Sequence, residues 1–284
     1  MKCTVCPHHC DIQEGQSGIC YARTCADGAI VPRNYGQVTS LALDPIEKKP
    51  LNRFYPGSWI LSLGSWGCNL NCPWCQNDSI SRGEDWSGEA GQRSARIRRG
   101  FIQMSPEEVV EKAIELKTDG NIGIAFTYNE PMICPEFLTD TAKLAHEAGL
   151  KNVLVTNGMI TQEAHEMFLP YIDAYNIDLK TSSAENYRAI GGDLDAIVAT
   201  IRRAASCAHV EVTNLVVPGF NDTEDEIRKT AGIIAKIDRD VPLHVTRFFP
   251  AGRMRDAEPT DVRLVYRFAE IAREYLTYVY TGNC

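Results

Sequence analysis

Three cysteines stand within eight residues of the chain, at Cys68, Cys72 and Cys75 in the stretch CNLNCPWC. In a reducing compartment, clustered cysteines indicate a metal site or catalysis rather than disulfides. A closed thiolate site has four ligands, and a four-iron cluster takes one external ligand for each iron. Three thiolates therefore predict a cluster with one iron left open for a substrate or cofactor. The alternatives are a zinc knuckle completed by a distant ligand and three unlinked cysteines.

The residues around this triplet suit a loop that wraps a cluster. Gly67 lets the backbone approach closely, and Pro73 stiffens the loop. Trp74 is placed to shield one face of the cluster from solvent and to pack on a bound cofactor. Two other cysteines, Cys134 and Cys207, stand alone, and we expect both to be small buried hydrophobes.

A second group of cysteines lies near the N-terminus, at Cys3, Cys6, Cys10 and Cys20. Four thiolates are enough for a closed zinc site or for a second iron–sulfur cluster. The segment 1–35 is short and poor in apolar residues, so it needs a covalent or metal staple to fold. We expect a metal there and favour zinc slightly over a cluster. A reduced, flexible tail is the alternative.

Strands and helices alternate from residue 59 onward. Ser105, Pro106 and Glu108 form the start signal of a helix, with an N-cap, a proline in the first turn and a capping box. Strands are expected at 59–63, 121–126, 151–156, 175–180, 209–217, 243–249 and, at the end, 277–282. Helices are expected at 105–117, 134–148, from 161, at 183–190, 193–207, 223–238 and 261–276. This alternation predicts βαβ units and a parallel sheet, either open or closed into a barrel.

Polar side chains recur where the predicted strands end. Examples are Asn129 and Glu130, Thr156 and Asn157, Asp178 and Lys180, Thr213 and Asn214, and His244, Thr246 and Arg247. The carboxyl ends of parallel barrel strands meet at one mouth, where active sites are built. Lys180 and Glu130 would suit a zwitterion, because Lys180 can bind its carboxylate and Glu130 can accept a hydrogen bond from its amine. Arg247 suits either a substrate carboxylate or a structural ion pair.

The spacing Cys68-x3-Cys72-x-aromatic-Cys75 after a first strand resembles the signature of the radical S-adenosylmethionine (radical SAM) superfamily. The resemblance covers essentially all of residues 59–283. It implies a partial (β/α)6 barrel and a 4Fe–4S cluster whose open iron binds S-adenosylmethionine. In that family the reduced cluster cleaves S-adenosylmethionine to methionine and a 5′-deoxyadenosyl radical, which abstracts a hydrogen atom from the substrate.

The resemblance also implies cofactor contacts. Asn129 and Glu130 lie where the family holds the methionyl amine, although the two glycines of the family stretch are absent. Thr156 and Asn157 lie at the usual ribose contacts. Asp178 and Lys180 resemble the Asp-x-Lys pair of glycyl-radical activating enzymes, in which the lysine meets the methionyl carboxylate. The remaining implied contacts are Asn214 with the cofactor, Val216, Val217 and Pro218 with adenine, and His244 near the cofactor.

The segments 3–23, 67–77, TYNEP, TNG, NIDLK and HVTRFFP resemble the radical SAM member of the AmmeMemoRadiSam group, relatives of pyruvate formate-lyase activating enzyme. This likeness implies a polypeptide substrate, a flavodoxin- or ferredoxin-like electron donor, Memo-type or AMMECR-type partners and an anaerobic setting. A small-molecule substrate is the alternative within the class, and a non-enzymatic metal-binding adaptor is the alternative outside it. The chain departs from these relatives in a longer 78–100 loop and in stopping at Cys284, where they often continue into a second cysteine pair.

Composition sets the wider limits. The chain has 284 residues, 44% of them apolar, and a net charge of -8, which argues against general binding to nucleic acid or anionic membranes. No apolar run of about 18 residues and no signal-peptide core are present, so we expect a cytoplasmic protein. We expect a cysteine-rich module at 1–35, a Pro-rich connector at 36–58 and a barrel at 59–284. Within the barrel, 78–100 is expected to be a mobile Arg- and Gly-rich loop or a docking strip for an acidic partner.

Overall fold

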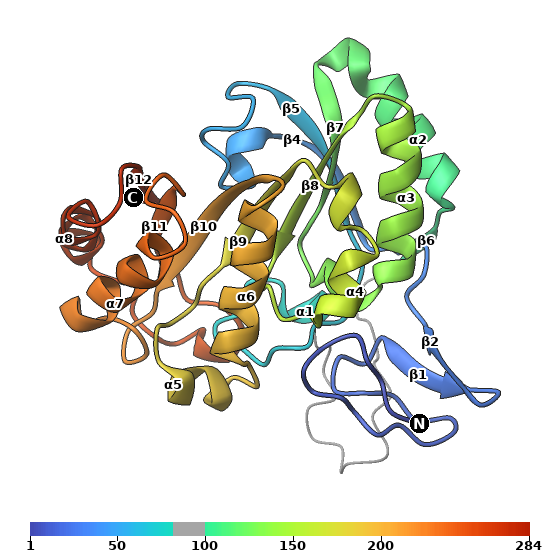
Figure 1. The fold of residues 1–284 in the computed structure, drawn as a ribbon, viewed down its shortest axis with the longest axis horizontal. Helices are drawn as coiled ribbons and strands as arrows, with labels where there is room; N and C mark the ends of the chain where they lie inside the picture. The colour runs from blue at the N-terminus through green and yellow to red at the C-terminus, as the bar shows by residue number, and fades with distance from the viewer. Residues whose placement is uncertain (82–99) are drawn as a thin grey trace.

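The computed structural model describes residues 1–81 and 100–284, and its centre is an eight-stranded sheet in the order β12-β11-β10-β9-β8-β7-β5-β4 (Figure 1). Every neighbouring pair from β5 to β12 is parallel, and only the edge strand β4 (Ser40–Pro45) is antiparallel to its neighbour. The parallel strands are β5 (Trp59–Gly64), β7 (Asn121–Phe126), β8 (Lys151–Thr156), β9 (Ala174–Asp178), β10 (His209–Val216), β11 (Leu243–Arg247) and β12 (Val279–Gly282). The predicted α/β class with a parallel sheet is confirmed, and the sheet forms a partial TIM-type barrel.

Helices follow the strands and cover the outside of the sheet (Figure 1). They are α2 (Pro106–Glu115), α3 (Pro135–Glu147), α4 (Gln162–Glu166), α5 (Ala184–Ala189), α6 (Leu194–Ala205), α7 (Glu224–Ala235) and α8 (Val262–Ala272). The predicted capping box is present, because Glu108 N donates to Ser105 Oγ and Ser105 N donates to Glu108 Oε2 at 2.7 Å. Short 3-10 turns are η1 (Ile46–Lys48), η2 (Leu116–Asp119), η3 (Pro131–Ile133), η4 (Leu169–Tyr171) and η5 (Gly252–Met254).

The segment before β5 contains more regular structure than its sequence indicated. A hairpin of β1 (Arg23–Ala26) and β2 (Ala29–Pro32) lies in the cysteine-rich segment, and β3 (Gln37–Val38) pairs with β6 (Ile102–Gln103). The stretch expected as a connector, 36–58, supplies β4 to the main sheet. Its pattern concealed the strand, because β4 is partly exposed at the sheet edge and ends in an Asp-Pro pair typical of loops.

The segment after β4 folds into the barrel rather than around it. Ile46 and Leu51 are fully buried and cluster with Ile60, Ala125, Val153 and Ala174 of the surrounding strands. Each such side chain contributes about 1.5–3 kcal/mol by leaving water. Asn176 Nδ2 also donates to Pro50 O at 2.9 Å. Residues 44–54, called the plug below, fill the amino end of the barrel interior and leave the carboxyl end free for a cavity.

The loop predicted at 78–100 falls almost wholly outside the described residues. Only its first turn, α1 (Asp78–Ser81), and Gly100 belong to the described part. Among the described residues there is no helix with both the length and the apolar composition that crossing a bilayer requires.

Candidate active site

A cavity of about 650 Å³ opens at the carboxyl ends of the parallel strands. Its walls come from the loops that follow β5, β7, β8 and β9 and from β10, β11 and β12. Eleven of the residues predicted from the sequence line it together: Cys68, Cys72, Trp74, Cys75, Asn129, Glu130, Thr156, Asn157, Asp178, Lys180 and His244. The register of the parallel strands therefore brings these residues from five separate segments to one place.

The cysteine loop is held by close backbone contacts on two sides. Gly67 has a φ of +91°, and a Cβ built there would lie 2.7 Å from Cys20 O and 2.8 Å from Ile133 Cδ1. On the other side, a Cβ at Gly252 would lie 2.7 Å from Pro73 O, and Arg253 N donates to the same oxygen at 2.7 Å. Both contacts need glycine, so the loop has a defined path.

The three thiols of this loop line one wall of the cavity. Among residues 1–81 and 100–284, no three His, Cys, Asp or Glu side chains are arranged to hold one ion. Thiolates of a four-iron cluster bind different irons, so they do not need to meet at one point. Burial raises the pKa of the Cys75 thiol, whereas the hydroxyl of Ser81 and the charge of Lys180 lower it. The net shift is upward, and the positive charge of Lys180 offsets only part of it.

Lys180 is a cation of the cavity wall whose charge acts on Cys72 and Cys75. Its Nζ lies 2.9 Å from Asp178 Oδ2. Burial lowers the pKa of Lys180, whereas the negative charges of Asp178 and Cys72 raise it. The charges together have the larger effect, so the net shift of the pKa is upward. The side chain is therefore an ammonium group at neutral pH and can bind a carboxylate.

Glu130 is the buried carboxylate of the same cavity, with 2% of its surface exposed. It accepts hydrogen bonds from Thr156 Oγ1 at 2.7 Å, Asn157 N at 2.8 Å and Met132 N at 3.0 Å. Burial raises the pKa of Glu130 to about 7, although these hydrogen bonds oppose the shift. A carboxyl group with this pKa changes protonation near neutral pH when a cation such as an amine binds beside it.

Two polar residues predicted to contact ribose have protein partners in this structure. Thr156 Oγ1 donates to Glu130, and Asn157 Nδ2 donates to Asn69 Oδ1 at 2.9 Å and to Cys68 Sγ at 3.6 Å. Asn129 likewise accepts from Ser65 N through Oδ1 at 2.9 Å. These side chains line the cavity and also order its charged groups and the cysteine loop.

Two rings line the cavity: His244 lies on β11, and Trp74 lies on the cysteine loop. His244 is 4% exposed, lies 2.6 Å from Glu211 Oε2 through Nε2, and stacks on Tyr280 with ring centroids 5.3 Å apart. Trp74 is buried on the cysteine loop and packs against Phe220 at a centroid distance of 4.5 Å. Both rings are therefore fixed in place by neighbours rather than free to rotate.

Five predicted site residues do not line the cavity in the described part of the chain: Asn214, Val216, Val217, Pro218 and Arg247. Asn214 Nδ2 donates to Leu179 O at 2.7 Å, and Val217 is fully buried in the core, with Pro218 following it. Arg247 donates to Thr260 O at 2.7 Å and lies over the ring of Phe249. Successive side chains of a strand point to opposite faces, so β10 presents Thr213 and Leu215 to the cavity in place of Asn214.

A buried charged cluster at the edge of the cavity was missed from the sequence. The carboxylate of Asp44 accepts from Lys48 Nζ at 2.7 Å, Lys49 Nζ at 2.8 Å and Tyr128 Oη at 2.7 Å. Lys48, Lys49 and Tyr128 line the cavity. Burial alone would raise the pKa of Asp44, but its three partners hold it well below the usual value. The only signal in the sequence was the charge density of DPIEKKP, which the adjacent prolines made look like a linker.

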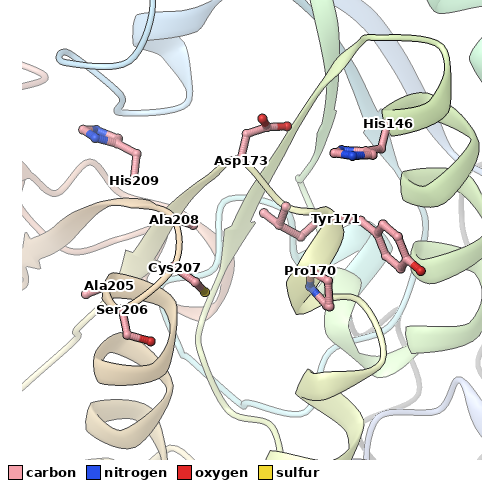
Figure 2. A pocket seen from close by; sticks show the side chains of 10 residues that line it. His146, Pro170, Tyr171, Asp173, Ala205, Ser206, Cys207, Ala208 and His209 are labelled. Carbon is pink, nitrogen blue, oxygen red and sulfur yellow. The ribbon is translucent and has the colours of Figure 1, made fainter.

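A second hollow of about 550 Å³ lies near the amino ends of β9 and β10, and its lining includes His146, Asp173, Cys207 and His209 (Figure 2). Its charged groups have structural partners, because Asp173 binds Lys151 Nζ at 2.7 Å and His209 binds Glu211 Oε1 at 2.9 Å. Cys207 is exposed, so the prediction that it is buried is wrong: it lies in the turn after α6 rather than on the packed face of the helix. Cys134 is buried as predicted.

The fold and the cavity together define a class: parallel α/β barrels with a cysteine loop directly after the first strand of the barrel. A family model described as the radical SAM superfamily matches residues 65–233, and the chain belongs to that superfamily. It is an enzyme of radical SAM type.

Two curated proteins and one solved structure are similar to the chain. The chain is 38% identical over 286 residues to an uncharacterised protein of Methanocaldococcus jannaschii, covering 100% of this chain and 81% of the relative. It is 26% identical over 178 residues to the pyruvate formate-lyase-activating enzyme of Clostridium pasteurianum, covering 60% of this chain and 67% of that enzyme. Among solved structures, a domain of pyruvate-formate lyase-activating enzyme from Bacteroides vulgatus superposes with a TM-score of 0.50 at 20% identity, covering 57% of this chain and 99% of that one.

Proposed function

We propose that Cys68, Cys72 and Cys75 hold a 4Fe–4S cluster and that the rest of the cavity binds S-adenosylmethionine. The observation that carries the proposal is the meeting of the cysteine loop, an ammonium group and a buried carboxylate in one cavity. Lys180 receives the methionyl carboxylate, and Glu130 receives the methionyl amine. His244, Thr156, Asn157 and Trp74 complete the walls around the cofactor.

When bound, the cluster and S-adenosylmethionine supply a 5′-deoxyadenosyl radical, made by one-electron cleavage of the sulfonium, which abstracts a hydrogen atom from the substrate. The chain positions these groups and excludes solvent from them. Trp74 and Phe220 form an apolar wall beside the cysteine loop. Glu130 offers its remaining acceptor positions to the incoming amine, and the positive charge of that amine favours its ionised form.

The substrate in this proposal is a polypeptide from which a backbone hydrogen is removed. Support comes from the similarity to a pyruvate formate-lyase-activating enzyme and from the Asp178–Lys180 pair at the cavity wall. Two of the residues that line the cavity, Lys48 and Asn283, are exposed to solvent. An extended segment of a partner protein can enter there. A flavodoxin- or ferredoxin-like protein is the proposed electron donor, and Memo-type or AMMECR-type proteins are the partners to screen.

Anaerobic reconstitution with iron and sulfide tests the cofactor assignment. We expect visible absorbance of an iron–sulfur cluster and formation of 5′-deoxyadenosine when S-adenosylmethionine and a reductant are added. Cys68→Ala should lose both signals, whereas Cys207→Ala, at an exposed cysteine outside the cavity, should keep both. A reconstituted wild-type protein that makes no 5′-deoxyadenosine under strong reduction would contradict the proposal.

The substrate class is tested by turnover in the presence of candidate proteins. A polypeptide substrate should show either a glycyl radical by electron paramagnetic resonance or a mass change on the partner chain. Consumption of a small molecule, with no change on any protein, would instead identify the alternative class.

A further inference from the structure

Three of the four N-terminal cysteines are buried, and Cys10 is half-buried. Cys3, Cys6 and Cys20 are 5–7% exposed, and Cys3 N donates to Cys10 O at 2.9 Å. Burial raises the pKa of Cys6 to about 12, and the nearby Cys20 and Cys10 raise it further; Cys3 and Cys10 act on Cys20 in the same way. The four sulfurs are therefore close enough to influence one another.

Cys25 does not belong to this group, although it is also buried. Its thiol donates to Glu14 Oε2 at 3.4 Å, and the same carboxylate accepts from the backbone of Asp27 and Gly28. Substitution of Cys25 is therefore a matched control for substitution of the other four N-terminal cysteines.

A cluster and a single ion place different demands on these four sulfurs. Four thiolates on one zinc lie about 3.8 Å apart, because a tetrahedral ion holds each sulfur at about 2.3 Å. Within the described residues no three cysteines are arranged to hold one ion in this way. The sulfurs of Cys68, Cys72 and Cys75 are likewise not arranged around one ion. The superfamily to which the chain belongs uses an iron–sulfur cluster. Zinc carries no redox chemistry, whereas an iron–sulfur cluster transfers electrons, so a site beside the cysteine loop of a redox cavity favours a cluster over the zinc that we slightly preferred from the sequence.

The N-terminal group is in contact with the cysteine loop of the cavity. Asn69 directly follows Cys68, is 1% exposed, and its side chain hydrogen-bonds the Cys6 thiol. Asn157 Nδ2 joins Asn69 Oδ1 to Cys68 Sγ. The His8 ring also lies 2.8 Å from Asn69 O. Two hydrogen-bonded side chains therefore separate the sulfur of Cys6 from that of Cys68.

The N-terminal segment contacts the barrel at the end where the cysteine loop lies. Arg23 Nη1 lies 2.6 Å from Glu136 Oε1, and Thr161 N donates to Val5 O at 3.0 Å. Figure 1 shows this segment at the end of the barrel where α1 lies. His9, next to Cys10, is exposed, so a protein can approach the group from outside.

We propose that Cys3, Cys6, Cys10 and Cys20 bind a second iron–sulfur cluster through which electrons reach the cavity. One electron leaves a reduced ferredoxin or flavodoxin, which is oxidised, passes through the N-terminal site, and arrives at the Cys68 site. The N-terminal site returns to its starting oxidation state in each passage. This role rests on the proposed function, because the electron is used only if S-adenosylmethionine is cleaved in the cavity.

Metal content tests the cluster directly. The reconstituted wild type and Cys25→Ala should each hold about eight irons per chain, and Cys6→Ala, Cys20→Ala and Cys68→Ala should each hold about four. Mössbauer spectra of the wild type should show two clusters, a readout that does not depend on any variant folding. About four irons together with one zinc in the wild type would overturn the proposal.

Electron entry is tested by comparing two reductants on the Cys68 cluster. In Cys6→Ala, reduction by flavodoxin should be lost while reduction by dithionite, which reaches clusters without a docking protein, should persist. Equal reduction by flavodoxin in Cys6→Ala and Cys25→Ala would overturn the relay. A wild type with about eight irons that makes no 5′-deoxyadenosine would refute the proposed function and leave the second cluster standing.

Discussion

His244 Nε2 lies 2.6 Å from Oε2 of Glu211, a carboxylate that is fully buried on the inner face of the barrel. Glu211 also accepts from His209 Nε2 at 2.9 Å and from the backbone N–H groups of Asn52 and Arg53 at 3.1 and 2.7 Å. It therefore joins two strands to the plug that fills the barrel. Burial would raise its pKa, but the histidines and the backbone donors lower it to about 2.

Removal of this carboxylate should destabilise the barrel strongly. We expect Glu211→Ala to lose about 3–5 kcal/mol of unfolding free energy, because it leaves buried partners unpaired. The folded pKa lies below the ordinary value of 4.5, so the stabilisation is present above that value and fades as pH falls toward about 2. Urea unfolding at neutral and acidic pH measures both effects, with the exposed Glu111→Ala as control. A loss near that of the control would contradict the prediction.

Glu130 should make stability depend on pH in the opposite sense. Its folded pKa of about 7 lies above the ordinary 4.5, so its contribution to stability is full below 4.5 and is lost as pH rises through about 7. The unfolding free energy of wild type minus that of Glu130→Gln should therefore fall between these values. S-adenosylmethionine should bind more tightly over the same rise, because the ionised carboxylate attracts the amine. A difference that is flat with pH would contradict the assignment.

Lys180→Met should weaken S-adenosylmethionine binding by roughly 10–100-fold, since a charge-assisted hydrogen bond contributes about 1.5–3 kcal/mol. Asp178, left without its partner, keeps contact with solvent at 35% exposure, so the fold should survive. Anaerobic equilibrium dialysis measures the affinity. The control is Lys151→Met, which breaks a Lys–Asp pair of 2.7 Å outside the cavity. Equal affinities in the two variants would show that Lys180 does not hold the cofactor.

Gly67→Ala tests the path of the cysteine loop. A methyl group there meets Cys20 O and Ile133 Cδ1, and the positive φ adds about 1–2 kcal/mol of strain. We expect loss of iron from the Cys68 site and a lower melting temperature. Gly28→Ala has a similar φ of +71° with open space around it, so it should show the strain but retain the iron. Iron retention by both variants would mean that the close contact of Gly67 with Cys20 O and Ile133 Cδ1 is not needed for cluster binding.

The candidate site could be predicted where chemistry and strand position coincide in the sequence. The cysteine triplet, Glu130, Asp178 and Lys180 follow strands that the apolar pattern indicated, and parallel strands bring their carboxyl ends together. Asn214 and Thr213 show the limit of this reasoning. Both are polar neighbours on one strand, and only the pleat decides which of them faces the cavity.

The sequence by itself determined the order of strands and helices, the helix caps and the cysteine spacing, because each depends on residues near one another in the chain. Only the tertiary structure decided that 44–54 enters the barrel, that Glu211 holds His244, and that Asn69 lies between Cys6 and Cys68. Those contacts join segments far apart in sequence, and they depend on strand register and on the docking of the N-terminal segment. No local pattern records them, since the same residues would look like an ordinary loop, an ordinary strand and an ordinary turn.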